Sequence, residues 1–211
     1  MSKPTVGLDV DDVVAVPHTM AALLDGLDVP HKERKEMEDM KARYKKGELA
    51  AVDVHKHRHA ILSNYDVEKR RDAIKSVVEA IPQENRQAVE ELKKFSEVVL
   101  YSNGDYDVMN AVGESLGVKT IAVNRYLMAF AFRTHKKSEA ADGLFPDVYV
   151  GDDPANEEDL FELARLKIVV ERKDKHADYT RFKERGYVFV GSLPEAVPAV
   201  KKFLAETKQA Q

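Results

Sequence analysis

Cysteine is missing from this chain of 211 residues. Its absence excludes disulfide bonds, thiolate metal sites and a cysteine nucleophile, and it is compatible with a reducing compartment. A large excess of one charge is missing too, because 33 Lys and Arg stand against 37 Asp and Glu, for a net charge of −4. This balance argues against a protein that holds nucleic acid by bulk electrostatics.

Long apolar runs are also absent. The longest, from Tyr126 to Phe132, falls far short of the roughly 20 residues that cross a bilayer as a helix. The first residues, Met-Ser-Lys-Pro, lack the apolar stretch of a signal peptide. We therefore expect a soluble cytoplasmic protein with no membrane partner. A hydrophobic content of 44% is enough for one core plus a small subdomain.

Short apolar segments rich in β-branched residues recur along the chain and predict buried strands. Segments with helical spacing separate most of them; within residues 85–95, for example, Ala88, Leu92 and Phe95 share one face. Alternation of strand and helix is typical of a parallel α/β sheet with right-handed crossovers. The predicted strands are Thr5–Leu8, Val98–Tyr101, Thr120–Val123, Val148–Val150, Ile168–Val170 and Tyr187–Val190.

Residues 17–81 break this alternation, because they contain no convincing strand. Within residues 32–46, many charged residues accompany Met37, Met40 and Tyr44, which recur at helical spacing. The charged face of this segment predicts a solvated helix surface rather than a binding patch. We expect residues 17–81 to form a helical insertion that caps the end of the sheet.

Acidic residues cluster where the first predicted strand ends. Asp9 and Asp11 lie two positions apart and Asp12 follows directly. Open α/β sheets bind ligands at the carboxyl ends of their strands. Carboxylates packed this closely repel one another unless a cation or protons compensate, and Mg²⁺ is the natural oxygen-binding partner. An ordinary acidic turn is the alternative interpretation of this short motif.

Polar residues also follow two later strands. Ser102, Asn103 and Gly104 follow the second strand and offer hydrogen-bond donors to an oxyanion, although Ser or Asn can equally cap a helix. A second acidic pair lies in Gly151–Asp153, and Lys136–Lys137 shortly before it can neutralise phosphoryl charge. Each feature alone has an ordinary structural explanation, but their order along the chain is much more specific.

That order resembles the haloacid dehalogenase (HAD) superfamily. Asp9 and Asp11 match its first motif, D-x-D-x-[T/V], and Ser102 matches the hydroxyl residue of its second. Lys137 matches the lysine of its third motif. Asp152–Asp153 match the acidic pair of its fourth. The resemblance implies a Rossmann-like α/β core with a parallel sheet.

Within that superfamily, the sequence is most similar to the phosphoserine phosphatase branch. The similarity extends from about Val6 to Val190 and includes Asn124–Leu127, which looks like a short segment of that branch. The branch carries a helical cap after its first motif, which residues 17–81 would form here. Residues 1–16 and 82–211 would then form the catalytic core.

The resemblance implies a phosphatase mechanism. The carboxylate of Asp9 would attack the phosphorus of a small phosphomonoester and form an aspartyl-phosphate that is then hydrolysed. Asp11 would protonate the leaving alkoxide and afterwards activate water. The Mg²⁺ site would draw on Asp9, Asp11, Asp152 and Asp153.

The resemblance also implies residues that bind the substrate. Ser102, Asn103 and Lys137 would contact the phosphoryl oxygens, and His18 and Arg58 would contact the leaving group. His18 stands nine residues after Asp9, where the phosphoserine phosphatase branch has a glutamate that binds the substrate amine. Because histidine offers no fixed negative charge, we expect phosphoserine to be a poor substrate and an acidic or neutral phosphomonoester to be a better one.

Several alternatives compete with this interpretation. The same core serves nucleotide phosphatases, sugar phosphatases and phosphotransferases, and a non-catalytic phosphate-binding protein is a further alternative. A dehalogenase is disfavoured, because its chemistry does not call for Asp11. Lys136 is the alternative to Lys137 as the phosphate lysine. His55 and His59 would share a helix face, but no third ligand has a suitable spacing, so we favour a basic cluster over a metal site.

Overall fold

The computed structural model describes residues 3–122, 136–141, 143–172 and 179–209. The predicted segments Asn124–Leu127 and Tyr126–Phe132 lie outside these residues.

Six strands form one sheet in the order β3-β2-β1-β4-β5-β6, and every pairing is parallel. The predicted α/β fold with a parallel sheet is therefore confirmed. The strands are β1 (Thr5–Asp9), β2 (Glu97–Ser102), β3 (Lys119–Ala122), β4 (Val148–Gly151), β5 (Leu166–Val170) and β6 (Val188–Val190).

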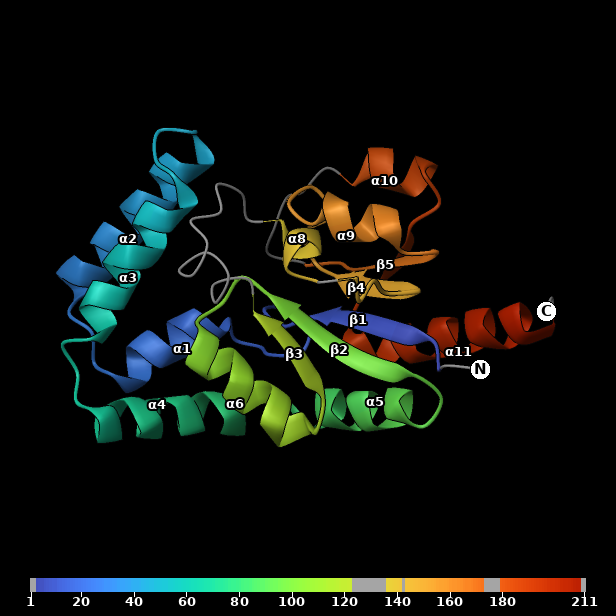
Figure 1. Cartoon of the computed structure of the whole chain (residues 1–211), viewed down its shortest axis with the longest axis horizontal. Helices are drawn as coiled ribbons and strands as arrows, with labels where there is room; N and C mark the ends of the chain where they lie inside the picture. The colour runs from blue at the N-terminus through green and yellow to red at the C-terminus, as the bar shows by residue number, and fades with distance from the viewer. Residues whose placement is uncertain (1–2, 123–135, 142, 173–178, 210–211) are drawn as a thin grey trace.

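Helices cover both faces of this sheet (Figure 1). Successive strand side chains point to opposite faces, so Val98 and Leu100 join one buried cluster while Val99 and Tyr101 join another. The first cluster lies against α5 (Gln83–Lys93), α6 (Tyr106–Leu116) and α11 (Leu193–Gln209). The second lies against α8 (Lys137–Ala140), α9 (Glu158–Leu163) and α10 (Thr180–Glu184). Among the described residues, every helix is too short or too polar to cross a bilayer.

Residues 17–81, all of which the structure describes, contain helices and no strand. The helices are α1 (Thr19–Gly26), α2 (His31–Lys45), α3 (Ala51–Leu62) and α4 (Val67–Glu79). Helices α2 and α3 lie side by side and project away from the sheet, whereas α4 packs against both α1 and α6 (Figure 1). The insertion therefore begins and ends with helices that pack on the core.

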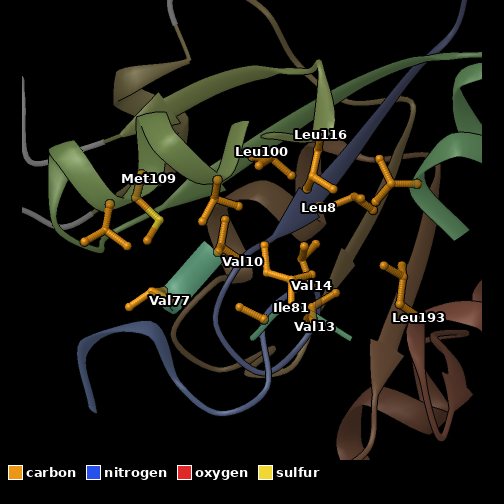
Figure 2. Close-up of a cluster of buried hydrophobic side chains, with 14 of the residues drawn as sticks. Leu8, Val10, Val13, Val14, Val77, Ile81, Leu100, Met109, Leu116 and Leu193 are labelled. Carbon is orange, nitrogen blue, oxygen red and sulfur yellow. The ribbon is translucent and has the colours of Figure 1, made fainter. Parts of the chain in front are cut away.

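The packing of α1 and α4 joins the insertion to the sheet. Figure 2 shows Val77 and Ile81, from α4 and its end, in one buried cluster with residues from β1 and the loop that follows it. Helices α1 and α4 approach closely, because a Cβ at Gly26 would lie 3.0 Å from the Cβ of Ala73. The domain boundaries at residues 17 and 81 stay a prediction, since one hydrophobic cluster spans both parts.

The loop after β1 forms a tight turn directly after the end of the strand. The amide of Val14 donates to the carbonyl of Val10 over 3.0 Å, and Asp12 adopts a positive φ of 66°. The buried side chain of Asn85, from α5, donates to the carbonyls of Val13 over 3.1 Å and Val14 over 3.0 Å. These bonds satisfy carbonyl groups that the turn would otherwise leave unpaired, and they hold the loop that carries the first acidic residues.

Candidate active site

Asp9 is the last residue of β1, a central strand with β2 on one side and β4 on the other. The residue is only 6% exposed. The register pairs Asp9 with Tyr101, so Ser102 lies one residue further along the neighbouring strand. The carboxyl ends of these parallel strands therefore gather the polar residues at one edge of the sheet, as the sequence predicted.

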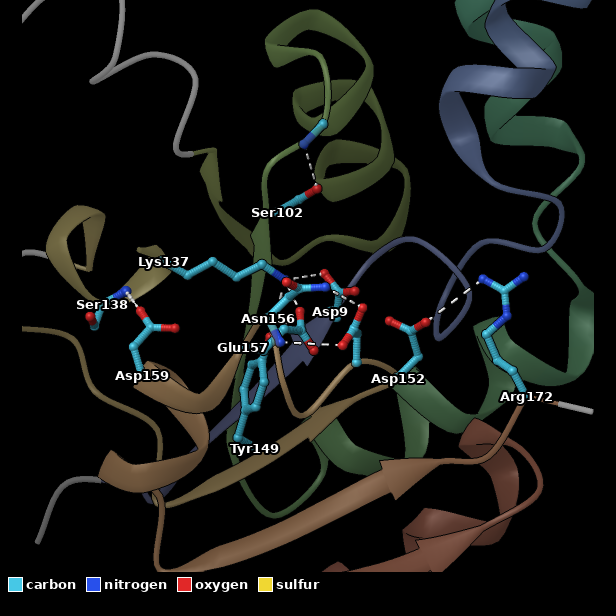
Figure 3. A network of polar contacts seen from close by, with 12 residues as sticks. Asp9, Ser102, Lys137, Ser138, Tyr149, Asp152, Asn156, Glu157, Asp159 and Arg172 are labelled. Atoms are coloured by element: carbon cyan, nitrogen blue, oxygen red, sulfur yellow. Dashed lines mark hydrogen bonds and ion pairs between the residues drawn. The ribbon is translucent and has the colours of Figure 1, made fainter. Parts of the chain in front are cut away.

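Lys137 makes the closest contact with Asp9. Its Nζ atom lies 2.5 Å from Asp9 Oδ1 and 3.2 Å from the hydroxyl of Tyr149, and it also pairs with Glu157 Oε1 (Figure 3). Burial alone would lower the pKa of Lys137, but Asp9 and Glu157 outweigh it and raise that pKa above its usual value. The buried ammonium group therefore keeps its positive charge.

Three buried acids meet at this point. Carboxylate oxygens of Asp9, Asp152 and Glu157 all lie within 4.8 Å of one another. Burial first, and then the charge of Glu157, raise the pKa of Asp9 well above its ordinary value. Lys137 and Arg172, which lies 3.7 Å from Asp152 Oδ2, supply two positive charges against three carboxylates, so the site holds excess negative charge when all of them are ionised.

This acidic cluster fits a hard divalent cation. Besides its excess charge, Glu157 Oε2 is buried and has no hydrogen-bond partner among the described residues. A buried carboxylate oxygen without a partner is costly, and a bound cation would satisfy it. Oxygen atoms are also the ligands that Mg²⁺ prefers. The structure is therefore compatible with the predicted magnesium site.

The structure does not bring the carboxylate of Asp153 into this cluster. Its oxygens accept hydrogen bonds from the amide of Asn156 over 3.2 Å and from the side chain of Asn156 over 2.5 Å. Asp153 thus stabilises the turn that carries the chain from Asp152 to Glu157. Glu157 supplies the third acid instead, because the turn places it beside Gly151, where any Cβ would collide with Glu157 Oε2.

Asp11 also lies outside the three-acid cluster and is held by the first helix of the insertion. Its Oδ1 atom accepts hydrogen bonds from both the amide and the hydroxyl of Thr19, each over 2.7 Å. His18 Nδ1 lies 3.4 Å from the same oxygen and accepts from the amide of Met20 over 3.3 Å. The start of α1 therefore holds Asp11 two residues after Asp9.

Ser102 and Asn103 lie at the end of β2. The hydroxyl oxygen of Ser102, which is 1% exposed, accepts from the amide of Gly104 over 2.9 Å. The side-chain oxygen of Asn103 is buried and has no hydrogen-bond partner among the described residues. Figure 3 shows Ser102 together with the contact between Asp9 and Lys137. Ser102 comes from β2, whereas Asp9 comes from β1 and Lys137 from α8.

His18 and Arg58 both line a cavity of about 400 Å³ formed by α1, α2 and α3. Burial lowers the pKa of Arg58, and the charges of Asp105, Asp11 and Glu38 act in the opposite direction. Because His18, which lines the cavity, lies 3.4 Å from Asp11 Oδ1, the cavity reaches toward the loop that follows β1. His18 and Arg58, which were predicted to contact the leaving group, thus line the same cavity beside Asp11.

No protein-family model matches the chain, and no curated protein matches its sequence. A substrate-bound phosphoserine phosphatase superposes with a TM-score of 0.62 at 17% identity, over 94% of this chain and 99% of that one. A phosphoserine phosphohydrolase-like protein from Francisella tularensis gives 0.66 at 16%, over 93% and 99%. L-2-Haloacid dehalogenase from Xanthobacter autotrophicus gives 0.55 at 14%, over 95% and 99%. The chain has the HAD fold.

The structural similarity confirms the HAD fold that the sequence motifs implied. Some contacts at this site were not predicted. Glu157 is one of several acids that follow β4 in the sequence, and Thr19 and Tyr149 carry no signal beyond their polarity. Arg172, just after β5, pairs with Asp12 and lies 3.7 Å from Asp152 Oδ2. A search of every strand end for charged residues would have found Arg172.

Proposed function

We propose that the protein is a magnesium-dependent phosphomonoester hydrolase in which Asp9 accepts the phosphoryl group. The observation that carries this proposal is the position of Asp9, buried at a strand end between one lysine and two further acids. A cation there would allow a nucleophilic carboxylate to meet an anionic phosphate. The fold shared with phosphoserine phosphatases supports the same proposal.

In the first step, a carboxylate oxygen of Asp9 forms a bond to phosphorus while the bond from phosphorus to the alcohol oxygen breaks. Asp11 donates a proton to that oxygen. Because Thr19 occupies Oδ1 of Asp11, we assign the transfer to Oδ2. In the second step, Asp11 takes a proton from water as the water oxygen attacks phosphorus, which releases inorganic phosphate and restores the carboxylate of Asp9.

We assign the metal site to Asp9, Asp152 and Glu157. Glu157 takes the place that the sequence had suggested for Asp153, and the carboxylate of Asp11 serves proton transfer. When bound, Mg²⁺ would offset the negative charge that otherwise opposes the approach of phosphate to Asp9.

Charge on the transferring phosphoryl group also needs protein donors. Lys137 is the buried cation next to Asp9, and we assign it together with Ser102 and Asn103 to the phosphoryl oxygens. His18 and Arg58 face the alcohol side of the substrate, because both line the cavity beside Asp11. The substrate in this proposal is a small phosphorylated molecule.

Hydrolysis of p-nitrophenyl phosphate tests the proposal. We expect activity that disappears in EDTA, returns with Mg²⁺, and falls by about 1,000-fold or more in Asp9→Asn. Asp107→Asn, at an exposed position on α6, is the matched control and should retain full activity. Full activity of Asp9→Asn, or phosphate binding without turnover by the wild type, would contradict the proposal; the latter result is expected of a non-catalytic phosphate-binding protein.

A further inference from the structure

The cavity inside the helical insertion is much larger than phosphoryl transfer alone requires. Its volume of about 400 Å³ falls within the range of about 300–1,000 Å³ that is typical of sites for whole small-molecule ligands. All of its lining residues come from α1, α2, α3 and His18, the residue that caps α1. Its apolar lining consists of Met20, Ala21, Leu24, Met37, Met40 and Val54.

The cavity begins where the alcohol part of a substrate has to lie. Asp11 is the acid assigned to the leaving oxygen, and His18, which lines the cavity, lies 3.4 Å from Asp11 Oδ1. Arg58 lines the same cavity and interacts electrostatically with Asp11. A phosphomonoester bound at Asp9 with its leaving oxygen at Asp11 would therefore extend its alcohol part toward α1, α2 and α3.

The charged groups around the cavity disfavour a positively charged ligand. Arg34 is occupied, since it donates to the carbonyls of Val29 over 2.7 Å and Leu24 over 2.8 Å. Lys41 and Arg58, in contrast, make no hydrogen bond or ion pair with the residues that the structure describes. Glu38 is the one acid in the lining, so the lining carries a net positive charge.

Two further features of the lining favour a ligand with a mainly apolar body. Methionine side chains such as Met37 and Met40 are flexible and polarisable, and they adapt to apolar ligands of varied shape. The imidazole of His57 also lines the cavity, and its Nε2 atom is buried and lacks a hydrogen-bond partner among the described residues. This combination resembles an apolar binding site with a few orienting polar groups.

We propose that the cavity binds an alkyl chain or aromatic ring of the alcohol, so that the substrates are phosphomonoesters of hydrophobic alcohols without a positive charge. This proposal rests on the proposed hydrolase function and adds the class of leaving group. A serine-sized alcohol leaves the apolar lining of the cavity largely unfilled, whereas a chain of six carbons can bury more apolar surface against that lining, which favours its binding.

The test compares kcat/KM for ethyl, butyl, hexyl and octyl phosphate and for O-phosphoserine. We expect hexyl phosphate to exceed both ethyl phosphate and O-phosphoserine by about tenfold or more, from the burial of added methylene groups. Ala21→Phe, which fills the cavity from an exposed position on α1, should lower the hexyl-to-ethyl ratio about tenfold. Ala42→Phe, exposed on α2 and outside the lining, is the control that should preserve the ratio.

If Ala21→Phe does not fold, Met40→Gln serves instead, because it keeps the length of the side chain and removes its apolar end; it must lower the same ratio. Calorimetric binding of hexylphosphonate and ethylphosphonate to the wild type separates the two proposals. Hydrolysis with no preference along the series, and equal binding of both phosphonates, would overturn the cavity proposal alone. Preferential binding of hexylphosphonate without hydrolysis of any ester would overturn the hydrolase and retain the cavity.

Discussion

The carboxyl group of Asp9 is buried next to Glu157 and Asp152, which makes its ionised form costly. Its pKa is therefore raised well above the ordinary value of 3.8. Between the unfolded and the native pKa, the native state binds more protons than the unfolded state, so stability falls as pH rises through that window. Without a cation, the site should thus weaken the fold at neutral pH.

This reasoning predicts that removing the charge of Asp9 stabilises the metal-free protein. In EDTA at pH 7, we expect Asp9→Asn to raise the free energy of unfolding by roughly 1 kcal/mol or more and to flatten its decline above the ordinary aspartate pKa. Urea unfolding from about pH 4 to pH 8 measures both effects, with Asp107→Asn as the exposed control. A destabilised Asp9→Asn at pH 7 would show that its contact with Lys137 outweighs the repulsion among the acids.

The structure places Glu157 in the acidic cluster, where the sequence interpretation had placed Asp153. Bound Mg²⁺ should raise the melting temperature of the wild type by mass action, and Glu157→Gln should need about tenfold more Mg²⁺ for the same rise. Asp153→Asn is the matched comparison and should retain most of the wild-type response, because Asp153 bonds to Asn156. The opposite ranking of the two variants would assign the third acid to Asp153.

Asp11 and Thr19 should act together on the leaving group. An alkoxide leaves poorly without a proton, whereas a nitrophenolate leaves readily, so Asp11→Asn should slow alkyl phosphates about 100-fold more than aryl phosphates. Thr19→Val keeps the backbone donor to Asp11 but removes the hydroxyl, and should show the same preference at about a tenth of the size. Equal losses for both substrate types would remove Asp11 from proton transfer.

Among the structural elements, the loop between β1 and α1 depends on one residue of α5. Asn85 is 6% exposed and holds two carbonyl groups of that loop. Asn85→Ala should lower the free energy of unfolding by about 1–3 kcal/mol, because it leaves buried carbonyls unpaired. Gln87→Ala, exposed on the same helix, should change it little. Similar urea midpoints for both variants would show that Asn85 does not hold the loop.

The strands were predictable because each is a short apolar run with β-branched residues, and all six were expected within two residues of their observed bounds. The helical nature of residues 17–81 was also predictable from spacing. The path of the turn after β4 was not. It depends on Asp153 binding Asn156, and this local hydrogen bonding decides that Glu157 enters the acidic cluster.

In the whole molecule, topology explains why the predicted residues meet. Asp9, Ser102 and Asp152 are far apart in sequence, yet the parallel sheet brings the ends of β1, β2 and β4 to one edge. A strand-end argument can therefore find Asp9, Ser102 and Asp152. It cannot find contacts that depend on side-chain direction, such as the pairing of Arg172 with Asp12, or a cavity enclosed by three helices of the insertion.

The central claim is that Asp9 carries a phosphoryl group during turnover. Trapping this phosphorylated intermediate tests the claim most directly. The protein would be mixed with Mg²⁺ and a rapidly hydrolysed aryl phosphate, quenched in acid within the first turnover, and digested for mass spectrometry. We predict one added phosphoryl group on the peptide that contains Asp9, lost on mild alkaline treatment as an acyl phosphate should be, and absent from Asp9→Asn. Rapid turnover with no phosphorylated peptide, or with the phosphoryl group on another residue, would contradict the account.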